Sequence, residues 1–194
     1  YPFIQSIYMS FTKTGAFNQS TWNGIANYKE ILTDDVFWQS MKNTLVYVLM
    51  TVPVGILLST VLAVLLNAKI KGTSFYRTIY FLPSVTMAAA IALVWKWIYN
   101  GEYGLLNVIL EAFGMDGVSW LTNPGTVMVA IGIVGIWCSF GYNTIILLAG
   151  LQSISKSYYE AAALDGANSW YVFWRITFPL LSPTVFFVVV TSLI

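Results

Sequence analysis

Four long stretches without a charged residue constrain the fold of this chain more than any other feature of its sequence. They cover residues 43–68, 78–95, 117–155 and 176–194. Each has the 18 or more residues that a helix needs to cross roughly 30 Å of hydrocarbon. A chain of 194 residues has too little other protein to cover four such helices, so lipid must surround them. The sequence therefore predicts an all-α membrane protein, a polytopic bundle of transmembrane helices.

The composition also argues against several classes of function. Hydrophobic residues make up 58% of the chain and charged residues 9%, about a third of the charge density of an ordinary soluble domain. No basic cluster could follow a phosphate backbone, so we expect membrane lipid and no nucleic acid among the partners. The chain has no histidine and one cysteine, Cys138, so we expect no disulfide framework, no metal site and no bound cofactor.

The apolar stretches and the turn residues between them predict one transmembrane domain over residues 1–194. Both ends are expected to be truncated, because Tyr1-Pro2 is not a translation start. Along the chain we expect the end of a first span at 1–10, an extracytoplasmic segment at 11–43 with a short helix within 26–42, a span at 44–66, a cytoplasmic loop at 67–77, a span at 78–97, an extracytoplasmic segment at 98–125, a span at 126–150, a cytoplasmic loop at 151–178 and a span at 179–194.

The orientation of these spans follows from the charges in two loops. Loop 67–77 contains three basic residues, whereas 98–125 contains three acids and neither lysine nor arginine. Basic residues concentrate on the cytoplasmic side of membrane proteins. We therefore expect 67–77 and 151–178 to be cytoplasmic and 98–125 to be outside. The basic residues are Lys69, Lys71 and Arg77, and the acids are Glu102, Glu111 and Asp116.

The loop 151–178 carries signals for two short helices. Ser157 and Glu160 have the spacing of a capping box, which predicts that a helix starts there. Asp165-Gly166 can end that helix by adopting the left-handed conformation. Asn168 or Ser169 can cap a second helix. The resulting helix-turn-helix leaves aromatic and apolar side chains exposed, and two interpretations are open on physical grounds: docking in the groove of a partner protein, or resting on lipid.

The same loop resembles the cytoplasmic signature of ABC importer permeases. The resemblance rests on Glu160-Ala161-Ala162, on Asp165-Gly166-Ala167, and on Phe173, Ile176, Pro179 and Pro183. Weaker matches elsewhere, including Phe81-Leu82-Pro83 and Gly104-Leu-Leu-Asn107, are similar to the carbohydrate-uptake branch, particularly the first permease of maltose, glycerol-phosphate or multiple-sugar systems. One departure is Ser155, where the family usually has proline, although a serine can still occupy a helix entrance.

The resemblance implies a multi-pass permease in the inner or plasma membrane of a prokaryotic cell. It implies that the loop forms a coupling helix seated in a cytoplasmic ABC ATPase dimer, and that a second permease subunit and an extracytoplasmic solute-binding protein complete the importer. ATP would be used by the partner subunits, since this chain lacks a G-x-x-x-x-G-K-[ST] phosphate loop. The coupling residues it implies are Glu160, Ala161, Ala162, Asp165, Gly166, Ala167 and Phe173.

Other functions stay open at this point. The solute could be an amino acid or a polyamine in place of a sugar. An ion-coupled transporter is less favoured, because the predicted span interiors contain no Asp, Glu, Lys, Arg or His to carry or coordinate an ion, although backbone carbonyls could still coordinate one. A membrane-embedded enzyme is least favoured and we expect no catalytic residue, because the spans offer hydroxyl groups and a thiol without a histidine base.

Three polar residues of the fourth span are the candidates for a solute path. Ser139, Tyr142 and Asn143 lie three and four residues apart and so share one face of a helix. Hydroxyl and amide groups beside an aromatic ring suit a polyol. The competing interpretation is that they form hydrogen bonds between helices, which is a common role of such residues in membranes.

Overall fold

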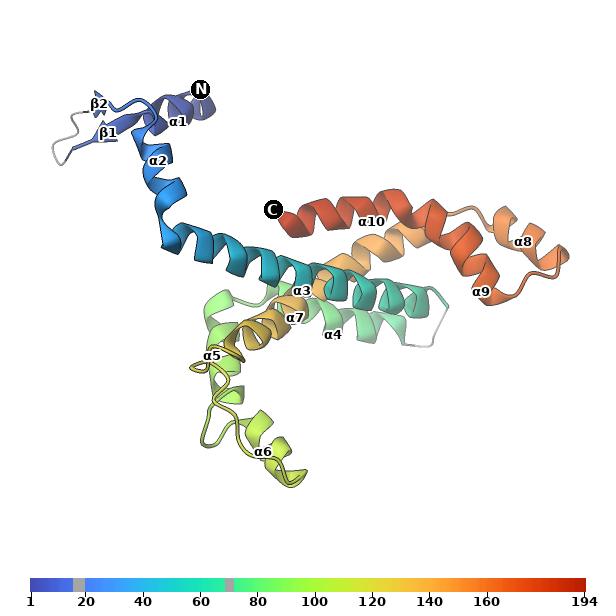
Figure 1. Ribbon diagram of the computed structural model, residues 1–194. Helices are drawn as coiled ribbons and strands as arrows, with labels where there is room; N and C mark the ends of the chain where they lie inside the picture. Colours follow the sequence, from blue (N-terminus) through green and yellow to red (C-terminus); the bar gives the residue numbers. More distant parts are fainter. Residues whose placement is uncertain (16–19, 69–71) are drawn as a thin grey trace. The chain divides into compact units, whose positions relative to one another are not determined.

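A computed structural model describes residues 1–15, 20–68 and 72–194. The chain divides into two compact units, Tyr1–Val46 and Tyr47–Ile194, and each is described by itself. Figure 1 gives the order of the helices and strands along the chain.

The smaller unit contains helix α1 (Pro2–Ser10), strands β1 (Thr12–Thr14) and β2 (Ser20–Trp22), helix α2 (Ala26–Thr33) and the beginning of α3 (Asp35–Asn67). The two strands pair antiparallel, with Lys13 opposite Thr21. Asn27 ties the hairpin to α1, because its amide donates to the carbonyl oxygens of Ser10 and Thr12 at 2.9 and 3.0 Å. The expected helices at 1–10 and within 26–42 are present. The predicted class, a bundle of transmembrane helices, is confirmed. The hairpin is an addition that the sequence does not reveal, since three-residue strands are too short to show an alternating pattern.

The larger unit is helical. After the rest of α3 it contains α4 (Thr73–Val85), α5 (Ala88–Ile98), α6 (Leu105–Ala112), α7 (Val127–Ser153), α8 (Lys156–Leu164), α9 (Ser169–Val172), a π-helical turn η1 (Phe173–Thr177) and α10 (Phe178–Leu193). In Figure 1, α4 and α10 both lie along α7. The core lies where α3, α7 and α10 meet, and its buried residues are Ala63, Leu66, Leu147, Leu148, Leu151, Leu181 and Val188.

Helix α7 crosses its neighbours closely because it presents a bare backbone at the crossing. A side chain at Gly141 would collide with the carbonyl oxygen of Tyr80 in α4. One residue earlier, the carbonyl oxygen of Phe140 accepts a hydrogen bond at 3.1 Å from the hydroxyl of Ser59 in α3. Small residues at helix crossings are typical of membrane bundles, where close packing drives association.

The spans differ from the prediction in three places. The helix expected at 44–66 begins at Asp35, because the carboxylate of Asp34 accepts from the Val36 N–H at 2.9 Å and caps the helix there. The single span expected at 78–97 is broken, and Phe75–Val85 and Ala88–Ile98 meet at 99°. Thr86 and Met87 interrupt the helix with extended ψ angles of 140° and 128°, shortly after Pro83, which lacks an N–H to donate.

The last correction concerns the span expected at 179–194. It begins ten residues earlier, because α9, η1 and α10 form one continuous helix over Ser169–Leu193. Among the described residues, three helices are long and apolar enough to cross a membrane: Asp35–Asn67, Val127–Ser153 and Ser169–Leu193. The bent pair makes a fourth if it counts as one span.

The segment 98–125 is organised by a single buried amide. Asn107 donates to the carbonyl oxygens of Gly101 and Val118 at 2.9 and 3.0 Å, and it accepts from the N–H of Val118 and the indole of Trp120. Tyr99 joins this segment to α7 by donating its hydroxyl to the Ala130 carbonyl oxygen at 2.8 Å. Burial raises the pKa of Tyr99, so its hydroxyl stays protonated as a donor.

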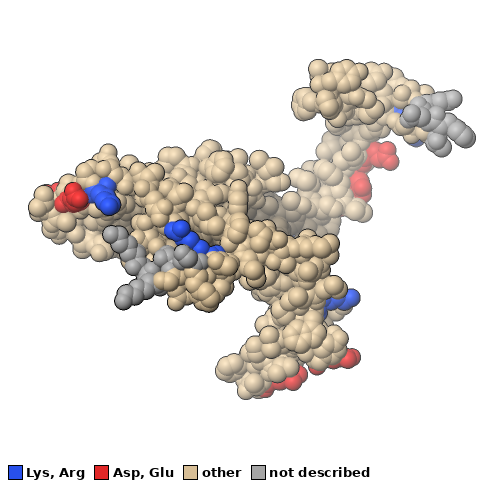
Figure 2. Space-filling view, turned by 180° about the vertical axis from the view of Figure 1, so that it is seen from behind, with Lys and Arg blue, Asp and Glu red and all other residues tan. Residues whose placement is uncertain are grey.

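The charged residues are few and grouped on the surface. Figure 2 shows that most of one face carries neither acidic nor basic side chains. Lys69 and Lys71, which carry most of the predicted charge contrast between the loops, lie outside the described residues. The orientation across the membrane therefore stays a prediction.

Candidate functional site

Helix α8 begins earlier than the sequence predicts. Its cap is Ser155, whose hydroxyl oxygen accepts a hydrogen bond from the Ser157 N–H at 3.4 Å. The predicted capping box of Ser157 and Glu160 is therefore wrong, because Ser157 already lies inside the helix and Glu160 occupies its second turn. Ser155 has the extended backbone of a cap residue, with φ −61° and ψ 134°. The prediction that a serine at 155 can occupy a helix entrance is confirmed.

The end of α8 follows the predicted chemistry. Gly166 has a positive φ of 70°, and the N–H groups of Gly166 and Ala167 donate to the carbonyl oxygens of Ala163 and Ala162 at 3.2 and 3.0 Å. This pairing is a Schellman motif, which reverses the chain after the helix. Asn168 then caps α9, since its side-chain oxygen accepts from the Tyr171 N–H at 2.8 Å. A side chain at Gly166 would have no other atom within 4 Å.

The turn brings most of the predicted coupling residues to one groove of about 580 Å³. We call this surface the docking groove; it is lined by Tyr158, Ala161, Ala162, Asp165, Gly166, Ala167, Asn168, Tyr171 and Ile176. Glu160 lies outside the groove on the exposed surface of α8. Phe173 lies apart from it and lines a second cavity behind α8. Five of the seven predicted coupling residues thus line this groove, and the other two lie elsewhere on the same segment.

The three candidates for the solute path line one cavity of about 300 Å³. We call it the central cavity. Ser139, Tyr142 and Asn143 contribute to it from α7, and the other lining residues are Tyr47, Thr51, Val52, Gly55, Gly135, Thr191 and Ser192 from α3, α7 and α10. All the polar lining side chains are uncharged hydroxyl or amide groups. Tyr47, Thr51 and Gly55 were not predicted as lining residues, although their spacing of four residues places them on one face of a helix.

The predicted side chains of the central cavity differ in their hydrogen bonds. The Asn143 side chain is 5% exposed, and the described residues offer it no side-chain hydrogen-bond partner. The Ser139 hydroxyl donates to the carbonyl oxygen of Gly135 in its own helix at 2.9 Å. Within the described part of the chain, the three predicted side chains make no hydrogen bonds to side chains of other helices.

Comparison with known proteins identifies the family. Residues 37–194 match the family described as "Binding-protein-dependent transport system inner membrane component". The chain belongs to this family. Its resemblance to ABC importer permeases is therefore confirmed.

Two relatives and a solved structure illustrate the similarity. The probable ABC transporter permease protein YesP of Bacillus subtilis (strain 168) is 39% identical over 189 residues, which are 96% of this chain and 60% of the relative. The lactose transport system permease protein LacF of Rhizobium radiobacter is 36% identical over 197 residues, covering 100% of this chain and 65% of the relative. A bacterial ABC transporter involved in the import of the acidic polysaccharide alginate gives a TM-score of 0.84 at 26% identity, covering 99% of this chain and 66% of that chain.

The chain is thus shorter than its relatives. It spans 60% of the length of YesP and 65% of that of LacF.

Proposed function

We propose that this chain is the transmembrane permease subunit of an ATP-driven ABC importer. It forms half of the translocation path for a sugar or sugar-like solute and couples that path to cytoplasmic ATPase subunits. It lies as a multi-pass protein in the inner or plasma membrane of a prokaryotic cell. The observation that carries the proposal is the exposed docking groove on α8 and its turn, in a chain that belongs to a transport family.

The coupling role is supported by the chemistry of the α8 segment. Leu164 is 91% exposed and Trp170 is 73% exposed, so this segment presents large apolar side chains outside the long apolar helices. A groove lined by alanines and Gly166 lets a partner approach the backbone closely. The sequence contains no phosphate loop, so hydrolysis falls to a partner subunit. An ABC ATPase dimer is the partner that fits these features and the family.

A sugar is supported as the solute by the central cavity. Its uncharged hydroxyl and amide groups can donate and accept hydrogen bonds, and the rings of Tyr47 and Tyr142 can cover the C–H faces of a sugar. An amino acid or polyamine carries charges that these residues would leave unpaired. Among the relatives, the permease named for lactose agrees with a neutral sugar, whereas the permeases named for sn-glycerol 3-phosphate are named for a charged polyol.

The remaining partners follow from the proposed importer. A second permease subunit supplies the other half of the path, and an extracytoplasmic solute-binding protein delivers the solute. A solved relative was crystallised in complex with an alginate pentasaccharide-bound periplasmic protein, which supports a receptor of this kind. In this proposal the chain itself has no catalytic site, no metal and no cofactor.

The test is reconstitution of the complete importer in lipid vesicles. The chain, its partner permease, the ATPase subunits and the receptor are co-expressed, and ATP hydrolysis is measured with lactose, sn-glycerol 3-phosphate, glutamine and spermidine. We expect a neutral sugar to stimulate hydrolysis and to accumulate inside the vesicles. Stimulation by glutamine or spermidine alone would overturn the sugar assignment. Failure of the ATPase subunits to bind the permease would overturn the importer assignment.

A further inference from the structure

Helix α8 is attached to the rest of the larger unit by very little. Ala162 is its one buried residue. Among the described residues, a single side-chain hydrogen bond joins α8 to another helix: it links the Tyr159 hydroxyl and the Thr177 hydroxyl at 3.3 Å, and either oxygen can be the donor. The chain also continues through the turns at 154–155 and 165–168, and Ala162 packs against its surroundings.

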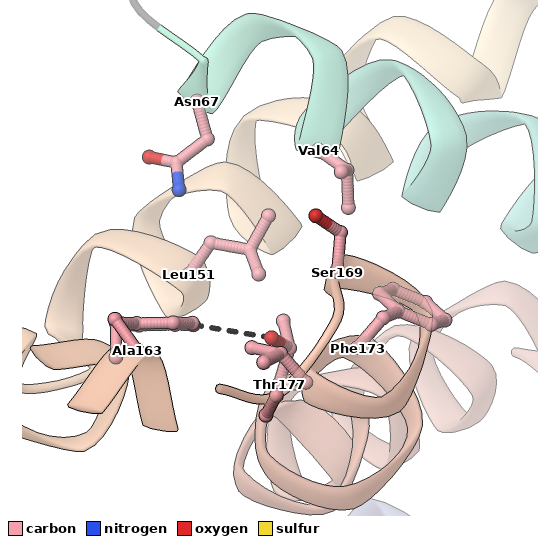
Figure 3. Close-up of a pocket in the computed structure, with 10 residues that line it drawn as sticks. Val64, Asn67, Leu151, Ala163, Ser169, Phe173 and Thr177 are labelled. Atoms are coloured by element: carbon pink, nitrogen blue, oxygen red, sulfur yellow. Dashed lines mark hydrogen bonds between the residues drawn. The ribbon is translucent and has the colours of Figure 1, made fainter. Parts of the chain in front are cut away.

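A cavity separates the inner face of α8 from the helices behind it. It has a volume of about 270 Å³. Figure 3 shows its walls, with Val64 and Asn67 from the end of α3, Leu151 from α7, and Phe173 and Thr177 from η1. Close-packed contacts leave no such space, so this part of the inner face of α8 lacks packed neighbours. The hydrogen bond at Thr177, drawn as a dashed line in Figure 3, is the fixed point on this side of α8.

Thr177 lies at an irregular turn of its helix. It is 7% exposed and is the last residue of the π-helical turn, where the Phe178 N–H bonds the Phe173 carbonyl oxygen. Single π-turns inside helices mark functional sites more often than regular turns do. The helix that contains Thr177 runs on without a break to Thr191 and Ser192, which line the central cavity.

We propose that Tyr159 and Thr177 are a positioning pair that transmits movement of α8 to the wall of the central cavity. A push on the docking groove displaces α8, and the hydrogen bond passes that displacement to the helix Ser169–Leu193. The cavity behind α8 gives the helix room to move while the pair keeps its position along the span. This inference rests on the proposed coupling of the chain to ATPase subunits.

The experiment measures how strongly MgATP binding and hydrolysis at the ATPase subunits change the accessibility of a residue in the central cavity. In the complete importer, with Cys138→Ser, a reporter Ser192→Cys is labelled by a small thiol reagent with and without MgATP. The parent should show a labelling rate that changes with MgATP. The measured quantity is the ratio of the labelling rates with and without MgATP. Tyr159→Phe and Thr177→Val each remove one hydroxyl, and each should bring this ratio about two- to twelve-fold closer to one, as expected for the loss of one neutral hydrogen bond.

Three further variants separate transmission from packing. Thr177→Ser keeps the hydroxyl and should retain the ratio of the parent. The double variant Tyr159→Phe/Thr177→Val should lose no more of the response to MgATP than the more affected single variant does, because both changes remove the same bond. Thr60→Val is the matched control, since its hydroxyl donates to the Ile56 carbonyl oxygen of its own helix. All variants should still copurify with the ATPase subunits.

The outcomes distinguish this inference from the proposed function. A parent whose labelling ignores MgATP contradicts the coupling function, and with it the positioning pair. A responsive parent with unchanged Tyr159→Phe and Thr177→Val variants overturns the pair alone. Equal losses in Thr177→Ser and Thr177→Val also overturn it, because packing of the side chain and not its hydroxyl would then carry the effect.

Discussion

Helices α7 and α8 follow one another in the chain and are held in opposite ways. Helix α7 has eight buried residues and a glycine pressed against the backbone of α4. Helix α8 has one buried residue, one side-chain hydrogen bond to another helix within the described residues, and a cavity behind it. The α7 residues of the central cavity, Ser139, Tyr142 and Asn143, therefore stand on a closely packed helix, whereas much of the docking groove stands on a loosely attached one.

The largest expected effect concerns the side of the membrane on which α8 lies: we expect α6 and α8 to lie on opposite sides. Cysteines are introduced by Glu111→Cys and Asp165→Cys in a chain carrying Cys138→Ser. An impermeant thiol reagent added to intact cells should label position 111 and leave position 165 unlabelled, following the charge contrast of the loops. Labelling in the opposite sense would invert the assignment and place the docking groove outside the cell.

The second prediction concerns the closely packed helix α7. Gly141→Ala forces a methyl group onto the Tyr80 carbonyl oxygen, and the two helices must separate. We expect a loss of about 3 kcal/mol in the free energy of unfolding, the upper end of the range for overpacking, because a backbone atom must move. The measurement is unfolding of the purified permease in detergent.

Gly55→Ala is the matched control for that measurement. Its added carbon would meet only the Ser139 hydroxyl oxygen, at 4.0 Å. Alanine also has the higher helix propensity, by about 1 kcal/mol. Equal destabilisation by the two substitutions would show that the crossing at Gly141 is not special.

The third prediction tests the amide of the central cavity. Asn143→Ala removes a group that has no side-chain hydrogen-bond partner among the described residues, so the bundle should keep its stability while solute binding weakens. We expect the half-saturating solute concentration for uptake to rise about two- to twelve-fold, as for one lost hydrogen bond. Unchanged uptake together with failed assembly would assign Asn143 a structural role.

The smallest expected effect tests how α8 begins. Ser155→Ala removes the observed cap and should cost about 1 kcal/mol of local helix stability. Hydrogen exchange of the α8 amides measures this cost, and Ser157→Ala should cost less. The reverse order would restore the capping box of Ser157 and Glu160.

The difference between α7 and α8 also explains what the sequence can predict. The helix α7 is expected at 126–150 and lies at Val127–Ser153, because an uncharged run without an internal proline satisfies its backbone hydrogen bonds in lipid as an unbroken helix. The end of α8 is equally predictable, since Gly166 allows a left-handed residue at little cost. Both features depend on neighbouring residues in the chain.

The features that the sequence does not reveal depend on residues far apart. The cap at Ser155 competes with a plausible cap at Ser157, and the choice between them is made by how the chain leaves α7. The break at Thr86 and Met87 lies inside an uncharged run, and Pro83 alone does not mark where the helix stops. The contributions of Tyr47 and Thr191 to the central cavity require three helices to be packed first.

The most direct test of the account is whether the turn after α8 is buried by an ATPase subunit. Gly166→Asn keeps the left-handed turn at low cost and adds a polar side chain to the docking groove. Gly166→Ala strains the turn by about 1–2 kcal/mol and adds little bulk. Glu160→Lys reverses an exposed charge beside the groove.

Copurification of the ATPase subunits with each variant permease is the measurement. If α8 docks on the ATPase subunits, Gly166→Asn and Glu160→Lys should retain less ATPase subunit on copurification than Gly166→Ala does, because they change the surface that the partner covers. Full copurification and normal solute-stimulated hydrolysis with both Gly166→Asn and Glu160→Lys would contradict the docking of α8.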